Sequence, residues 1–185
     1  MARLFIALIH YPVVDRSGRV VASAITSLDL HDLARSARTY GVSAFYIVHP
    51  VAEQREFAAR VIGHWMNGPG RQFDSRRREA LDLARIVPDL EAALTDAAGM
   101  GEKPLLTVHT SARAVGQLSY AELRQRLDTP DGPPVMLLFG TGFGLAPVML
   151  ERTDLALAPL LGPADYNHLS VRAAAGIILD RLRGQ

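Results

Sequence analysis

The sequence predicts an α/β fold with a mainly parallel sheet and helices on both of its faces. Short apolar runs alternate along the whole chain with segments of helical periodicity, and this order is typical of parallel sheets. The strand candidates are continuously apolar, as expected for strands that are buried on both faces. The 185 residues are 49% hydrophobic, and no repeat or linker interrupts them, so we expect a single domain over residues 1–185.

The first half of the chain alternates apolar strands with helices whose ends carry capping signals. Thr26 or Ser27 can cap the first helix, and Gly41 is placed to stop it. The expected elements are a strand at Leu4–His10, a loop from Pro12 to Ala24, a helix over Asp29–Tyr40, a strand at Ala44–Val48, a helix over Ala52–Met66, a loop at Asn67–Gly70, a helix over Arg76–Arg85, a short strand at Ile86–Val87 and a helix over Asp89–Ala98.

The second half continues the alternation. Ser119 and Ser170 each precede a run of helical periodicity and are expected to cap it. The expected elements are a strand at Leu105–His109, a helix over Tyr120–Leu127, a strand at Val135–Phe139, a short helix near Val148–Thr153, a strand at Leu155–Leu160 and a helix over Val171–Leu182.

Composition excludes several kinds of chemistry. The chain has no cysteine, so disulfides, thiolate metal sites and cysteine nucleophiles are excluded, and we predict no metal site. The net charge of +1 favours no class of partner. The apolar N-terminal run is too short to span a bilayer and lacks a small-residue cleavage site, so we expect a core strand, no membrane partner and a cytoplasmic protein.

The turn after Val135–Phe139 is the most informative motif. This buried strand runs into Gly140-Thr141-Gly142-Phe143-Gly144. Glycines allow positive φ and let backbone approach a ligand closely, and the end of a parallel strand is where open α/β sheets bind small molecules. The alternative is a tight turn that binds no ligand.

Three further segments contain groups of similar residues, and each group has a structural and a functional interpretation. Asp29, Asp32 and Arg35 crowd the first helix, where they either compensate the helix dipole or face a substrate. The arginines within residues 71–85 form either a solvated helix face or a phosphate-binding patch. The small residues Ala173–Gly176 suit either ordinary packing or close approach of a threaded loop or second subunit.

Taken together, these motifs resemble those of the SPOUT RNA methyltransferases. FGTGFG and NHLSVRAAAGIILDRL are similar to the second and third motifs of that superfamily, and DLHDLARSARTYGVSAFYIV is similar to the first. The resemblance covers roughly residues 26–48 and 105–183. Within the superfamily, the chain looks like a small bacterial group of stand-alone proteins that is related to tRNA (guanine-N1) methyltransferase.

The resemblance implies an enzyme that transfers a methyl group from S-adenosylmethionine (SAM) to tRNA or rRNA. It also implies a C-terminal trefoil knot, although true knots are rare, and a homodimer whose active site uses both subunits. A catalytically silent SAM- or RNA-binding module of the same fold is the alternative. A nucleotide-dependent α/β enzyme is disfavoured, because neither G-x-G-x-x-G nor a P-loop appears.

The resemblance also assigns residues. Arg35 falls where 2′-O-ribose members carry their functional arginine, and Asp29 and Asp165 are the accompanying catalytic candidates, Asp165 as a general base. Those enzymes usually have asparagine near Asp29 and a glutamate in the glycine loop, so the target atom stays open. The implied SAM-binding residues are Thr107, His109, Thr110, Phe139, Gly140, Thr141, Gly142, Gly144, Leu160, Leu161, Asn167, His168, Leu169 and Ser170.

Overall fold

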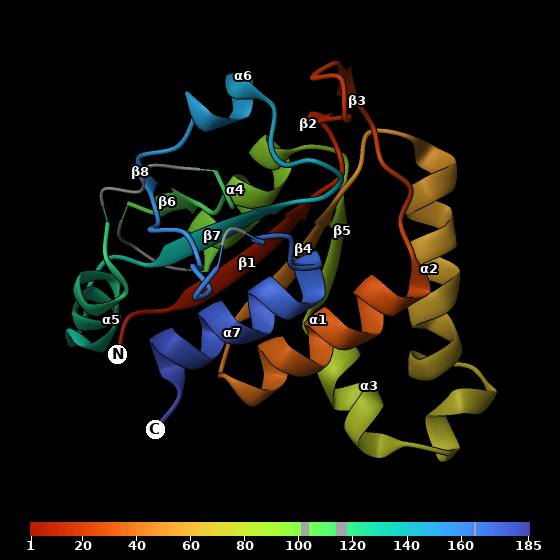
Figure 1. Ribbon diagram of the computed structural model, residues 1–185. Coiled ribbons are helices and arrows are strands. Elements are labelled where there is room, and N and C mark those ends of the chain that lie inside the picture. The colour runs from red at the N-terminus through yellow and green to blue at the C-terminus, as the bar shows by residue number, and fades with distance from the viewer. Residues whose placement is uncertain (101–103, 114–117, 165) are drawn as a thin grey trace.

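The centre of the molecule is a six-stranded parallel sheet with strand order β5-β4-β1-β7-β6-β8 (Figure 1). The computed structural model describes residues 1–100, 104–113, 118–164 and 166–185. The strands are β1 (Leu4–Ile9), β4 (Ala44–Val48), β5 (Ala84–Val87), β6 (Leu106–His109), β7 (Val135–Gly140) and β8 (Leu155–Ala156). The parallel α/β architecture predicted from the alternation is therefore confirmed.

Helices cover both faces of the sheet, as predicted. Apolar side chains of α1, α2, α3, α5 and α7 form one core with alternate residues of the central strands, and those of α4 and α6 form the other. Figure 1 shows α1 and α7 side by side in front of the sheet and α4 behind it. The helices are α1 (Ser27–Thr39), α2 (Ala52–Met66), the 3₁₀ turn η1 (Pro69–Gln72), α3 (Ser75–Leu81), α4 (Leu90–Gly99), α5 (Tyr120–Asp128), α6 (Pro147–Leu150) and α7 (Val171–Arg183).

The central strand pair β1–β7 fixes the place of the glycine turn. Every residue of β1 is buried, and its register with β7 runs from Leu4 opposite Val135 to Ile9 opposite Gly140. Burying each large aliphatic side chain contributes about 1.5–3 kcal/mol, so the core holds this register firmly. The turn that begins at Gly140 therefore starts level with the end of β1.

The helix ends follow their predicted signals. Thr26, Ser119 and Ser170 each cap a helix through a side-chain oxygen that accepts a backbone N–H, and Ser119 forms a capping box with Glu122. Gly41 follows α1 with a φ of +66°, the conformation that glycine adopts most easily. Among the described residues, no helix combines the length and apolar character needed to cross a membrane.

The segment predicted as a loop from Pro12 to Ala24 instead contains a hairpin, and this prediction was wrong. Its strands β2 (Val13–Val14) and β3 (Val20–Val21) pair antiparallel. The Asp15 carboxylate accepts hydrogen bonds from the backbone N–H groups of Ser17 and Arg19 and closes the turn. Two-residue strands are too short to show an alternating pattern of apolar and polar residues, so no periodicity marks them.

Three other elements are shorter or displaced relative to the prediction. The helix expected to reach Arg85 ends at Leu81, because Ala84–Val87 joins the sheet edge beside β4. The strand expected over Leu155–Leu160 ends at Ala156, after which the chain leaves the sheet. The short helix near Val148–Thr153 spans Pro147–Leu150 instead, with its proline at the helix start, where proline is well tolerated.

Candidate functional site

A cavity of about 690 Å³ lies where β6, β7 and β8 end. Its size falls within the range of small-molecule pockets, roughly 300–1,000 Å³. The lining comes from the segments that follow these three strands, from the start of α7 and from the approach to α1: Ser23, Ala24, Asp29, Thr110, Ser111, Ala112, Arg113, Tyr120, Phe139, Gly140, Thr141, Gly142, Phe143, Gly144, Ala158, Pro159, Leu160, Asn167, His168, Leu169, Ser170, Val171, Arg172, Ala174 and Ile178. Carboxyl ends of parallel strands are the usual ligand edge of such sheets.

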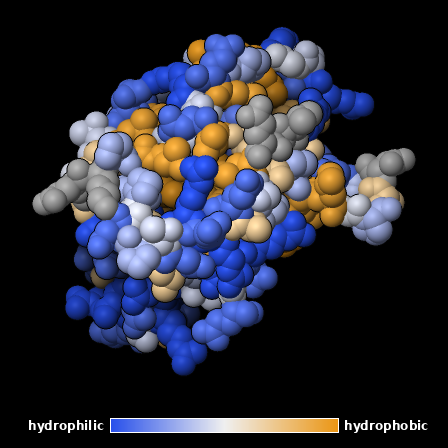
Figure 2. Space-filling view, turned by 90° about the vertical axis from the view of Figure 1, so that its left-hand side faces the viewer, coloured by the Kyte–Doolittle hydropathy of each residue, from blue (hydrophilic) through white to orange (hydrophobic). Residues whose placement is uncertain are grey.

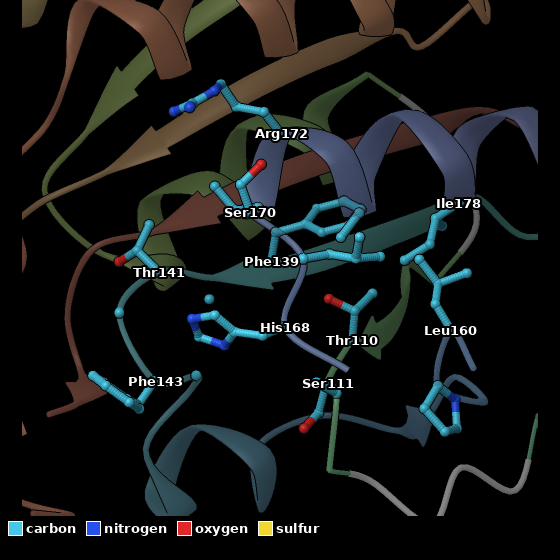
Figure 3. Close-up of a pocket in the computed structure, with 18 of the residues that line it drawn as sticks. Thr110, Ser111, Phe139, Thr141, Phe143, Leu160, His168, Ser170, Arg172 and Ile178 are labelled. Atoms are coloured by element: carbon cyan, nitrogen blue, oxygen red, sulfur yellow. The ribbon is translucent and has the colours of Figure 1, made fainter. Parts of the chain in front are cut away.

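Most of the residues predicted to bind SAM come together around this cavity. They are Thr110, Phe139, Gly140, Thr141, Gly142, Gly144, Leu160, Asn167, His168, Leu169 and Ser170. Figure 3 shows Thr110, Thr141, His168 and Ser170 around one open space. The structure thus juxtaposes segments that are far apart in the sequence, and the SAM-binding role of each residue stays a prediction.

Thr107, His109 and Leu161 do not line the cavity. The Thr107 hydroxyl donates to Asp154 Oδ2 at 2.7 Å, and the Thr107 backbone N–H donates to the same oxygen at 2.8 Å. His109 Nδ1 lies 2.6 Å from the Thr153 hydroxyl, and burial lowers the pKa of His109. Thr107 and His109 thus join β6 to the segment that leads into β8. The side chain of Leu161 points to solvent instead, and 72% of this residue is exposed.

The glycines shape the turn itself. A Cβ at Gly140 would lie 2.7 Å from the backbone nitrogen of Leu145, and a Cβ at Gly142 would lie 3.2 Å from the Val14 carbonyl. Gly142 and Gly144 also have positive φ, at 60° and 110°. The close contact at Gly142 exists because the β2–β3 hairpin lies on the turn: the Phe143 N–H donates to the Val14 carbonyl at 3.0 Å.

A chain of hydroxyl hydrogen bonds runs from the core to the cavity wall. His10, which is fully buried, has its Nδ1 2.9 Å from Ser23 Oγ, and Ser23 Oγ contacts Thr141 Oγ1. Thr141 Oγ1 donates to the Ile9 carbonyl at 3.2 Å, so it can accept from Ser23, which in turn accepts from His10. Burial is the main cause that lowers the pKa of His10 to about 4, and neighbouring His49 adds to the shift.

Asp29 and Arg172 form the charged part of the wall. Arg172 Nη1 donates to Asp29 Oδ1 at 2.6 Å, and its Nε lies 3.4 Å from Asp32 Oδ2. The other Asp29 oxygen, Oδ2, accepts from the Thr26 hydroxyl at 2.7 Å. Since both oxygens of this buried carboxylate are engaged, the geometry makes Asp29 a positioning group for Arg172.

The sequence analysis did not identify Arg172 as a functional residue, although its position at a helix start was one indication. It stands in the first turn of α7, where the helix dipole disfavours a cation. A cation in that place requires carboxylate partners, and Asp29 and Asp32 on α1 supply them.

The other catalytic candidates lie elsewhere. Arg35 is exposed on α1 and lies in a shallow groove that also includes Tyr40 and, from α7, Gly176. It does not line the cavity of its own chain. Asp165 lies outside the described residues. His168 is the one histidine among the described residues that line the cavity. Its ring centroid lies 6.4 Å from that of Phe143 and 6.5 Å from that of Tyr166.

The cavity is amphipathic. Phe139, Leu160 and Ile178 give one part an apolar surface, whereas Thr110, Ser111 and other hydroxyl groups line the rest (Figure 3). Figure 2 looks onto the side of the molecule that carries α5, β8 and α6, and hydrophobic side chains gather near the centre of that face. Within the described ranges, no group of three histidine or acidic residues could hold a metal ion.

A parallel α/β sheet with an amphipathic cavity beside a glycine turn is typical of the class of α/β domains that bind small organic molecules. The comparison with known families is more specific. Residues 3–184 match the model of a family described as SAM-dependent RNA methyltransferase, and the chain belongs to that family. Membership of such a family, predicted from the resemblance, is therefore confirmed.

Two relatives differ in how much of their length this chain matches. A tRNA (guanine-N(1)-)-methyltransferase of Nitratidesulfovibrio vulgaris is 44% identical over 181 residues, which cover 98% of this chain but 42% of that protein. An uncharacterized protein of Aquifex aeolicus is 40% identical over 181 residues, which cover 97% of this chain and 87% of that protein. The chain thus spans less than half of the named methyltransferase.

Solved structures share the fold at low sequence identity. The SpoU methyltransferase AviRb of Streptomyces viridochromogenes, in complex with the cofactor AdoMet, has a TM-score of 0.57 and 19% identity, covering 97% of this chain and 56% of that one. TrmJ of Z. mobilis has a TM-score of 0.62 and 14% identity, covering 100% of this chain and 69% of that one. These likenesses support the parallel α/β fold that the alternation of strands and helices predicted, and the trefoil knot stays a prediction.

Proposed function

We propose that the cavity beside the glycine turn binds SAM and that tRNA is the RNA that receives the methyl group. The observation that carries the binding site is the convergence of the turn, the β6 end and the start of α7 on one cavity of about 690 Å³. The relative from N. vulgaris that is named for tRNA supports the substrate. Because that protein is more than twice as long as its match here, its guanine-N1 target is not assigned to this chain.

The residues present fit SAM. The apolar part of the cavity suits an adenine ring, and the hydroxyl groups and turn backbone suit the ribose and the amino-acid end. SAM has no phosphate and needs no free cation; of the two arginines in the lining, Arg172 is already paired with Asp29 and Asp32, and Arg113 is exposed. When bound, SAM supplies an electrophilic methyl group on a sulfonium.

The chain's own side chains then orient the reactants and take up a proton. Asp29 holds Arg172 at the cavity wall, where the Arg172 side chain is 32% exposed and can meet a polar group of RNA. His168 projects into the cavity in Figure 3 and is exposed. Histidine is suited to general base catalysis near neutral pH, so we assign it that role alongside the sequence candidate Asp165.

A homodimer and a trefoil knot complete the proposal. Both rest on the resemblance, and α7 supports the dimer because Ala173 and Ile177, one turn apart, leave a small and an apolar side chain exposed. Light scattering at micromolar concentration should give about twice the monomer mass of 20.1 kDa. A stable monomer with full SAM affinity would argue against a shared active site.

Calorimetry and a transfer assay test the function. SAM should bind with a Kd in the micromolar range, about −8 kcal/mol, and label from SAM should appear in bulk tRNA from cells that lack this protein. Label in rRNA alone would refute tRNA as the substrate. Binding without transfer to any RNA would favour the silent module. Mass spectrometry of nucleosides from the same cells identifies the modified atom.

A further inference from the structure

We infer that η1 and α3 form an RNA-docking surface in which Phe73 stacks on a base while Arg71 and Arg76 contact phosphates. The inference rests on the proposed function, which requires an RNA partner. It goes beyond that function by naming the part of the chain that holds the RNA outside the cavity.

Phe73 is the first observation. It lies between η1 and α3, and 89% of it is exposed. The segment around it is well fixed: the Phe73 N–H donates to the Gly70 carbonyl at 3.1 Å, and Asp74 caps α3 by accepting from the Arg77 N–H at 3.0 Å. An aromatic ring held in water on a fixed turn loses little conformational freedom when a base stacks on it.

The arginines are the second observation. Arg71 and Arg76 flank Phe73, are exposed, and take part in none of the ion pairs found among the described residues. Asp74, the acidic residue between them, is occupied by the cap and by Arg77 at 3.6 Å. Two unpaired guanidinium groups beside an exposed ring are the combination that single-stranded nucleic acid binds.

The docking surface is supported by a packed base, which consists of Trp65, Arg77, His31 and Gly70. Arg77 lies over the Trp65 ring, with its Cζ 4.3 Å from the ring centroid, and His31 of α1 meets Trp65 edge-on at 5.7 Å. A Cβ on Gly70 would lie 2.7 Å from Trp65, so η1 packs directly on α2. Figure 1 shows η1 and α3 at the end of α2, beside α1.

This base also connects the surface with the cavity. Asp29, at the cavity wall, and His31 lie two residues apart on α1. Burial lowers the pKa of His31, and the nearby cations Arg77 and Arg35 lower it further, against the opposing effect of Asp32. Arg77 of α3 and Arg35 of α1 therefore both lie near His31, two residues from Asp29 at the cavity wall.

Anisotropy of fluorescently labelled bulk tRNA tests the inference. Phe73→Ala should weaken binding about 5- to 100-fold, whereas Phe73→Tyr should bind like wild type because it keeps a stacking face. The double variant Arg71→Glu/Arg76→Glu should weaken binding at least about tenfold and reduce the slope of log Kd against log salt by about 1–2. The matched control is Arg3→Glu/Arg126→Glu, two exposed arginines on the N-terminal and α5 side of the molecule.

Each outcome has a defined meaning. SAM affinity is measured on every variant to check that it is folded. If the double variant does not fold, the comparison of tRNA binding by Phe73→Ala and Phe73→Tyr tests the docking surface on its own. Equal tRNA binding by the Phe73 variants, or equal losses in the double variant and its control, overturns the docking surface and leaves the proposed function intact. If the protein binds heparin as tightly as tRNA and Phe73→Ala does not weaken tRNA binding, the surface is a general polyanion site and the inference is overturned. Wild-type protein that binds no RNA at all refutes the proposed function and this inference together.

Discussion

Asp29 and Arg172 are 143 residues apart in the chain, yet their side chains meet at 2.6 Å on the wall of the cavity. The contact joins the first turn of α1 to the first turn of α7. It therefore ties the first motif of the sequence to the third. Because Asp29 is 6% exposed, its charge depends on Arg172 for compensation.

Arg172→Ala should lower the free energy of unfolding by about 1–3 kcal/mol, because it leaves a buried carboxylate without its cation. Urea unfolding followed by circular dichroism measures the change. Arg172→Lys should recover part of the loss, since it restores the charge but not the two-carboxylate geometry.

Arg19→Ala is the matched control for that experiment. Arg19 also pairs with an aspartate, Asp15, at 2.8 Å, but its side chain is 80% exposed. Removing it should cost about 0–1 kcal/mol. Equal stabilities of the Arg172→Ala and Arg19→Ala variants would contradict a structural role for the Asp29–Arg172 pair.

Gly140→Val should abolish SAM binding in calorimetry. The added Cβ would come within 2.7 Å of the Leu145 backbone, so the turn that lines the cavity has to move. Gly63→Ala in α2 is the control, because a Cβ there meets nothing within 4 Å and alanine favours the helix. Wild-type SAM affinity in Gly140→Val would remove the glycine turn from the binding site.

The strands and helices were predictable because each is specified by its own residues. Continuous apolar runs marked β1 and β7, and Thr26, Ser119 and Ser170 marked helix starts. The hairpin β2–β3 was not predictable, because its two-residue strands depend on Asp15 and on contact with the glycine turn. Tertiary contacts of this kind leave no periodic trace in a sequence.

The site was predictable in part for the same reason. Gly140 and Ser170 belong to motifs that a sequence shows directly, and both line the cavity. Thr107 and His109 also follow the motif pattern, but their side chains turn toward Asp154 and Thr153. The direction of a side chain at the end of a strand depends on what packs beside it, and that information lies elsewhere in the chain.

Stability should fall as the pH drops from about 6.5 to about 4, and His10 should account for part of the loss. The pKa of His10 is lowered from 6.5 to about 4 in the folded chain. Between these values the unfolded chain binds the proton and the folded chain does not, so unfolding becomes more favourable as the pH falls. The His10 contribution amounts to roughly 3 kcal/mol at most and is fully present above pH 6.5.

His10→Asn tests this contribution, because asparagine keeps a donor toward Ser23 and does not titrate. The variant should be less stable at pH 7 but should lose less stability between pH 7 and pH 4 than the wild type does, as measured by urea unfolding at each pH. His64→Gln, which replaces a histidine at an exposed position, is measured alongside as the control. Parallel stability curves for wild type and His10→Asn would show that His10 is not the titrating group.

Arg35→Ala should leave SAM affinity within about twofold of wild type and lower methyl transfer to tRNA by about two orders of magnitude or more, as loss of a group that acts in the transition state does. Arg35 is exposed, does not line the cavity of its own chain, and makes no ion pair among the described residues. Its removal should therefore spare both the cofactor site and the melting temperature. We expect it to contact the RNA or the attacking group.

Arg38→Ala is the internal control, since Arg38 is exposed one turn further along α1 and shares nearly the same helix face. It should lower transfer much less than Arg35→Ala if the position of Arg35 matters, because a phosphate contact at the helix end contributes to binding and not to the transition state. A melting temperature lowered by Arg35→Ala alone would make Arg35 a structural residue. A folded Arg35→Ala variant with full activity on the true substrate would show that the first motif does not carry the functional arginine.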